Sequence, residues 1–138
     1  MAPEVNFVTT NPAQLNDRVT ELQIALQLDE ANNLQGAEYT SAGAITPGGN
    51  AVLKTGAASA MTLALPLPGS QLNGGQDFAT MQIVALDAHA YTVTVPSAFN
   101  GGSDTVATFG GTAGDSMQLL AYDGVWYVTN LTGVTLGT

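Results

Sequence analysis

The fold is indicated most clearly by residues 117–128, which read Met117-Gln118-Leu119-Leu120-Ala121-Tyr122-Asp123-Gly124-Val125-Trp126-Tyr127-Val128. Two apolar runs flank Asp123-Gly124, a dipeptide typical of two-residue type I′ turns, in which both central residues need positive φ. Successive side chains of a strand point to opposite faces, so Trp126 and Tyr127 are expected on opposite faces. These residues predict an antiparallel hairpin within a β domain.

Similar short runs recur from residue 39 onward, separated by turn residues every 8 to 15 positions. Pro47-Gly48-Gly49-Asn50 is expected to close a hairpin, and residues 66–69 and 99–104 are expected to be loops. No helix of useful length is expected after residue 40, so the fold class is all-β, a small β-sandwich or barrel-like domain over residues 39–138. We expect its strands near residues 39–45, 51–54, 61–65, 78–86, 90–95, 105–109, 116–122, 125–130 and 134–136.

The first 38 residues differ in composition and form the predicted N-terminal arm. Asn11-Pro12 is typical of a helix start, and a helix is expected over about residues 12–32. Its apolar positions are spaced 4, 3 and 4 apart, as in a coiled-coil seam. Two interpretations stay open: an amphipathic helix packed on its own β domain, or the stalk of a homotrimer. The seam consists of Leu15, Val19, Leu22 and Leu26.

Charge excludes several partners. The chain has only two basic residues, Arg18 and Lys54, against eleven acidic ones, for a net charge of -9. Binding a polyphosphate requires a cluster of cations that replaces its counterions, so nucleic acid is not an expected partner. Anionic membranes are excluded for the same reason. No basic and apolar leader is recognised at residues 1–4, and no run of about 18 apolar residues occurs, so we expect synthesis in the cytoplasm of the producing cell.

No residue pattern predicts catalysis. The chain has no cysteine, and its single histidine, His89, lies near Asp87 at an expected turn, without a positioned nucleophile. The glycine pairs precede no helix and no Lys-Ser/Thr dipeptide, so they are expected to be turns and not phosphate loops. No calcium-loop spacing is present. We therefore expect no catalytic, cofactor-binding or metal-binding residues, and we do not expect an enzyme.

The β region has few charged residues to keep the surface of a monomer solvated. It contains only five acidic residues and one lysine in about one hundred positions. Such a surface suits burial against copies of the same chain, and a β domain and a helical seam on one threefold axis would reinforce each other. Trp126 is expected in the core or at the subunit interface, and a glycan platform is the alternative for the aromatic pair.

The sequence resembles the head-decoration proteins of tailed bacteriophages, also called cement or head-fibre proteins. The resemblance covers about residues 40–136, while the arm is similar only in general character. It implies a homotrimer on the exterior of the virion capsid that bridges major capsid protein subunits and has no catalytic residues. The similar stretches are residues 44–48, 88–93, 99–102, 107–110 and 120–128.

Residues 2–10 are the expected capsid anchor, since they carry the apolar Val5, Phe7 and Val8 and have no place in the β pattern. Extended peptides of this kind add to a sheet edge or place alternate side chains in pockets. A frayed terminus is the other interpretation of these residues. The alternative function is a trimeric tail-fibre or adhesin domain that binds host-surface glycans through loops such as residues 97–104.

Overall fold

The computed structural model describes residues 19–21 and 36–138. The chain divides into two units, Met1–Leu34 and Gln35–Thr138. In the first unit, the described residues Val19, Thr20 and Glu21 are helical. The remainder of the helix predicted over residues 12–32 lies outside the described residues. The β domain begins slightly before the expected boundary at residue 39, because its first strand starts at Gly36.

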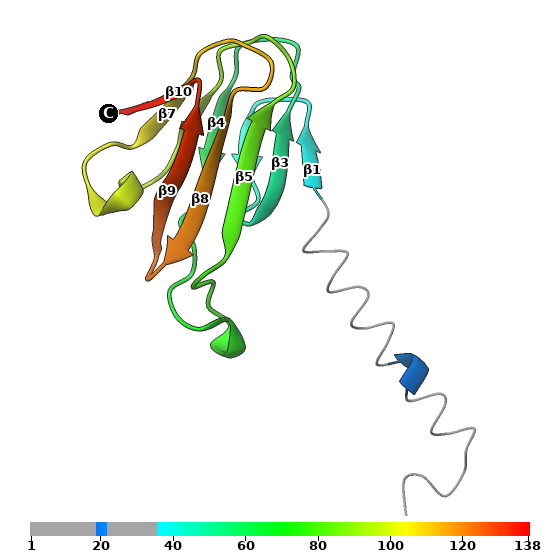
Figure 1. Cartoon of the computed structure of the whole chain (residues 1–138), viewed down its shortest axis with the longest axis vertical. Helices are drawn as coiled ribbons and strands as arrows, with labels where there is room; N and C mark the ends of the chain where they lie inside the picture. Colours follow the sequence, from blue (N-terminus) through cyan, green and yellow to red (C-terminus); the bar gives the residue numbers. More distant parts are fainter. Residues whose placement is uncertain (1–18, 22–35) are drawn as a thin grey trace, which may run out of the picture. The chain divides into compact units, whose positions relative to one another are not determined.

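The second unit consists of two five-stranded sheets, which confirms an all-β domain (Figure 1). Its helical content is limited to two short 3-10 turns, η2 (Gln71–Asn73) and η3 (Phe99–Gly101). One sheet has the order β1 (Gly36–Tyr39), β3 (Gly49–Leu53), β5 (Thr80–Ala85), β8 (Ser116–Tyr122) and β9 (Val125–Thr132). The other has the order β10 (Val134–Gly137), β7 (Val106–Phe109), β6 (Thr92–Thr94), β4 (Ala60–Leu63) and β2 (Gly43–Ile45).

The first six strands wind between the sheets, and this differs from the expected hairpins. Strands β1, β3 and β5 pair in parallel in one sheet, and β2, β4 and β6 pair in parallel in the other. The segment predicted as one strand over residues 39–45 is therefore two strands in different sheets, separated by a bend. The predicted hairpin at Pro47-Gly48-Gly49-Asn50 is also wrong. It is a corner between sheets, in which Gly48 and Gly49 have φ of 95° and 71°.

The C-terminal half is antiparallel, as residues 117–128 predicted. Strands β8 and β9 are joined by Asp123 and Gly124, whose φ values of 50° and 78° match a type I′ turn. Strand β9 has a register irregularity opposite Gln118 and Leu119. Strands β7 and β10 complete the second sheet with antiparallel pairs.

The hydrophobic core lies between the two sheets. It consists of the side chains that point inward from the strands and alternate with side chains that point outward. Trp126 is fully buried, and its Nε1 donates a hydrogen bond to the carbonyl of Ala64 at 2.9 Å. Tyr127 faces outward and is 37% exposed, so the predicted alternation is confirmed. The largest fully buried side chains are Trp126, Tyr91, Phe99, Phe109, Ile45, Leu53, Met61, Leu63, Ile83, Met117, Leu119 and Val93.

Strand directions give the β domain two distinct ends. Because β1, β3 and β5 are parallel, their first residues lie at one end of the sheet and their last residues at the other. The end that includes residues 64–79 and the β8–β9 turn is called the pocket end; it is lower in Figure 1. The opposite end, with residues 54–59, 86–91 and 110–115, is called the network end.

Candidate functional site

The long connection between β4 and β5 is built as a rigid loop. Its two arms are joined by hydrogen bonds between Gln76 N–H and the Leu67 carbonyl, and between Leu67 N–H and Gln76 Oε1, both at 2.8 Å. The arms also approach closely at Gly75, where a Cβ would lie 2.1 Å from the Gly69 carbonyl oxygen. Only glycine fits there, so the loop has one well-defined path.

Asp77 fixes this loop to the β8–β9 hairpin. Its Oδ1 accepts hydrogen bonds from Gly69 N–H at 3.2 Å and from Asp123 N–H at 2.8 Å. At the other side of the loop, Gln71 Nε2 donates to the Asp77 carbonyl at 2.9 Å. The carboxylate therefore links three chain segments and positions the 3-10 turn η2 beside the hairpin.

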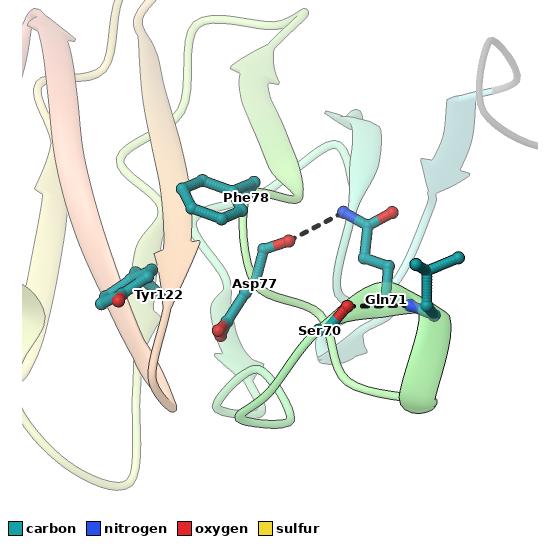
Figure 2. Close-up of a pocket in the computed structure, with 6 residues that line it drawn as sticks. Ser70, Gln71, Asp77, Phe78 and Tyr122 are labelled. Carbon is teal, nitrogen blue, oxygen red and sulfur yellow. Dashed lines mark hydrogen bonds between the residues drawn. The ribbon is translucent and has the colours of Figure 1, made fainter.

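A shallow pocket of about 300 Å³ lies between η2 and the hairpin (Figure 2). Ring centroids of Phe78 and Tyr122 are 5.4 Å apart at an interplanar angle of 54°. Leu72 is 97% exposed, Phe78 68% and Tyr122 48%. Three apolar side chains are thus presented to solvent by a hydrogen-bonded frame. The lining residues are Ser70, Gln71, Leu72, Asp77, Phe78 and Tyr122.

Phe78 has an unusual backbone conformation, with φ of 67°. This region suits glycine and asparagine, and it is a genuine outlier for a bulky side chain. Its N–H donates to the Ala121 carbonyl at 2.7 Å, while Ala121 N–H donates to the Ala79 carbonyl at 2.8 Å, so pairing with β8 maintains the conformation. Such residues cost about 1–3 kcal/mol and cluster at functional sites.

The network end contains the pair considered for catalysis. Both carboxylate oxygens of Asp87 accept hydrogen bonds, Oδ1 from the Tyr91 hydroxyl and Oδ2 from Gly56 N–H at 3.0 Å. The Tyr91 hydrogen bond lowers the pKa of the Asp87 carboxyl below its ordinary value, with smaller contributions from Gly56 and His89. Partial burial opposes this shift. His89 N–H donates to the Asp87 carbonyl at 3.0 Å. The arrangement is a structural network that closes the connections around β3, β5 and β6.

The same network continues through Thr55. Its N–H donates to the Tyr91 hydroxyl oxygen at 2.9 Å, and its hydroxyl lies 2.7 Å from that of Ser59. Nearby, the buried Asp115 accepts a hydrogen bond from Thr112 N–H at 3.0 Å. The side chains of Thr55, Ser59, Asp87, Tyr91 and Asp115 therefore form hydrogen bonds within their own chain.

Within residues 19–21 and 36–138, no group of three His, Cys, Asp or Glu side chains is placed to hold a metal ion. No helix in those same ranges is long and apolar enough to span a membrane.

The sequence-predicted site residues are located as follows. Trp126 is fully buried within the β domain, which is the core alternative of the two positions expected for it. Val19 is helical and 45% exposed. The remaining predicted residues lie outside the described part of the chain: Val5, Phe7, Val8, Leu15, Leu22 and Leu26.

In the loop considered for the glycan alternative, Ser97 and residues 100–103 are exposed, while Ala98 and Phe99 are buried. Phe99 is buried in the core, and its N–H donates to the Asp104 carbonyl at 2.8 Å. Asn100 Oδ1 accepts from Val128 N–H at 2.7 Å. This loop is closed against β9, and the exposed aromatic side chains lie elsewhere.

Sequence reasoning missed Leu72, Phe78 and Tyr122 as a group. The sequence contained one signal for Phe78. In a strand with alternating faces, Phe78 falls on the same face as Thr80 and Gln82, and on the face opposite the buried Met81 and Ile83. That placement predicts an outward-facing aromatic residue.

The strand faces are almost free of charge. Among the ten strands of residues 36–138, Glu38 on the edge strand β1 is the single residue of the Asp, Glu, Lys, Arg and His types. A row of amide side chains crosses one sheet, and threonines cross the other. The paired rows are Asn50, Gln82, Gln118 and Asn130 on one sheet, and Thr92, Thr108 and Thr135 on the other.

Comparison with known proteins gives no family: no family model matches the chain, and no curated protein matches it significantly.

Proposed function

We propose that this chain is a decoration protein of a tailed-bacteriophage capsid, which binds the outside of the assembled shell as a homotrimer and stabilises it. The observation that carries the proposal is the near absence of charged residue types from the described strands, where Glu38 is the single Asp, Glu, Lys, Arg or His. A monomeric β-sandwich normally places charged residues on its outer faces and edges, which keeps it soluble and blocks edge pairing. Sheets whose faces and edges carry only one charged residue type, Glu38 on β1, suit a protein that packs against other protein surfaces.

The physical role is stabilisation by mass action. A ligand that binds the assembled shell, and not its dissociated subunits, shifts the equilibrium toward assembly. In a homotrimer joined by the arm residues Leu15, Val19, Leu22 and Leu26, three linked contacts add avidity, so each contact can be weak. Anchoring by Val5, Phe7 and Val8 would place the protein on the major capsid protein.

Two measurements test this proposal. Light scattering of the full chain should report three times the mass of one chain, and a monomer at micromolar concentration would contradict the homotrimer. Co-sedimentation with purified empty shells should be saturable. The alternative, a fibre domain that binds host glycans, predicts no binding to shells and a positive glycan array.

The arm is tested by deleting residues 2–10. We expect the truncated chain to remain a trimer and to lose its co-sedimentation with shells, because the anchor is removed while the seam remains. A truncated trimer that binds shells with unchanged affinity would place the anchor in the β domain.

A further inference from the structure

We propose that the pocket end of the β domain is a second docking surface for the shell, in which Leu72 and Phe78 insert into an apolar depression with a basic rim on a capsid subunit. This inference rests on the proposed decoration function. It concerns a surface of the β domain, and the arm is a separate anchor.

The pocket end exposes apolar side chains on a loop whose backbone is held by hydrogen bonds. Leu72 and Phe78 are 97% and 68% exposed, although hydrogen bonds through Gln76 and Asp77 hold the loop in place. A loop whose backbone is held before binding loses less conformational freedom on contact, which favours affinity. Aromatic and aliphatic side chains in such positions commonly dominate protein interfaces.

The backbone of Phe78 also indicates a contact outside the chain. Its φ of 67° disfavours a bulky side chain, and its ring gains only partial cover, mainly from Tyr122. Folding alone would be served better by asparagine or glycine at this position. The ring is therefore retained for a contact outside the chain.

The charges of the β domain indicate the kind of partner. Asp77 lines the pocket and Asp123 follows the lining residue Tyr122, whereas the one Lys or Arg of residues 36–138, Lys54, follows β3 at the network end. Two copies meeting through this surface would bring like charges together. A protein surface with Lys or Arg around an apolar depression is complementary.

The experiment compares full-length variants in co-sedimentation with purified empty shells. The double variant Leu72→Ser, Phe78→Asn should bind at least about tenfold more weakly, which is the loss expected for two interface anchors. The matched control is Leu86→Ser, since Leu86 is 47% exposed and follows β5 at the network end. Its affinity should be unchanged within about twofold.

A second variant tests the charge. Asp123→Asn keeps a residue that tolerates the positive φ of the turn and removes one carboxylate. We expect weaker binding to shells and a smaller dependence of affinity on salt, because one attraction to the basic rim is lost. Unchanged affinity and unchanged salt dependence would contradict the proposed basic rim on the capsid subunit.

The outcomes separate this inference from the function on which it rests. If the wild-type chain does not bind shells, the proposed function falls and the inference falls with it. If the wild-type chain binds and the double variant binds equally well, only the inference is overturned. Binding of a neutral glycan that is lost in the double variant, with shell binding intact, would also overturn it and assign the pocket to a sugar.

Discussion

The two ends of the β domain differ in whether their side chains are hydrogen-bonded within the chain or exposed to solvent. At the network end, the Asp87 carboxylate accepts hydrogen bonds from Tyr91 and Gly56, and Thr55 pairs with Ser59. At the pocket end, hydrogen bonds fix the backbone of the loop, while Leu72 and Phe78 remain exposed.

This difference separates stability from recognition. Hydrogen-bonded polar side chains that close the connections lower the free energy of the folded chain, because unpaired groups there would be costly. Exposed apolar side chains on a strained backbone do not contribute in that way. The network end is therefore interpreted as structural, and the pocket end as a surface that acts on a partner.

The largest expected effect lies between the two ends, at Trp126. Trp126→Ala should lower the free energy of unfolding by about 3–5 kcal/mol, since the side chain is fully buried and its Nε1 pairs with the Ala64 carbonyl. Urea denaturation measures the change. A loss below about 1 kcal/mol would show that the core is not packed as described.

Gly133→Ala tests the network end. Gly133 has φ of 67°, and a Cβ there would lie 2.0 Å from Asp115 Oδ1, so the substitution strains the backbone and displaces a buried carboxylate. We expect a loss of about 1–3 kcal/mol in the free energy of unfolding. Gly137→Ala is the matched control, because an added Cβ meets nothing within 4 Å. Equal stability of the two variants would contradict a structural role for the network end.

Phe78→Asn tests the pocket end, where we expect that the substitution does not lower the free energy of unfolding. Asparagine accepts positive φ readily, and little buried surface is lost, so the free energy of unfolding should stay the same or rise by about 1 kcal/mol. Thermal melting under matched conditions measures it. A clear decrease in the melting temperature would mean that the ring stabilises the fold and is not reserved for a partner.

The smallest expected effect concerns pH and Asp87. Because its pKa is lowered in the folded chain, its contribution to stability is present above the unfolded pKa and is lost as pH falls through the folded pKa. Asp87→Asn should therefore show a weaker decrease in stability than the wild-type chain on acidification from about pH 5 to about pH 2.5. Superimposable pH profiles of urea denaturation would contradict this role.

Local chemistry explains which parts of the fold were predictable. The alternation in residues 117–128 and the Asp123-Gly124 turn depend on neighbouring residues, and both are confirmed. The corner at Pro47-Gly48-Gly49-Asn50 was misjudged because glycine and proline serve a hairpin and a passage between sheets equally well. Parallel pairing of β1, β3 and β5 depends on distant residues, which a single sequence does not reveal.

The candidate site was hidden for a related reason. Leu72 and Phe78 belong to one loop, but Tyr122 joins them only because β8 pairs with β5. The positive φ of Phe78 has no signal in sequence, since the residue type that usually marks such a position is absent. For Trp126, the sequence predicted only that it and Tyr127 lie on opposite faces, and the burial of Trp126 beside the exposed Tyr127 confirms this alternation.

The most direct test of this account is electron cryomicroscopy of purified empty shells saturated with the full-length chain. We predict threefold-symmetric density on the outer surface, with residues 64–79 and the Asp123-Gly124 turn of each β domain facing the capsid subunits. Shells without added density would contradict the decoration function. Density in which residues 86–91 and 110–115 face the shell would retain that function and contradict docking through the pocket end.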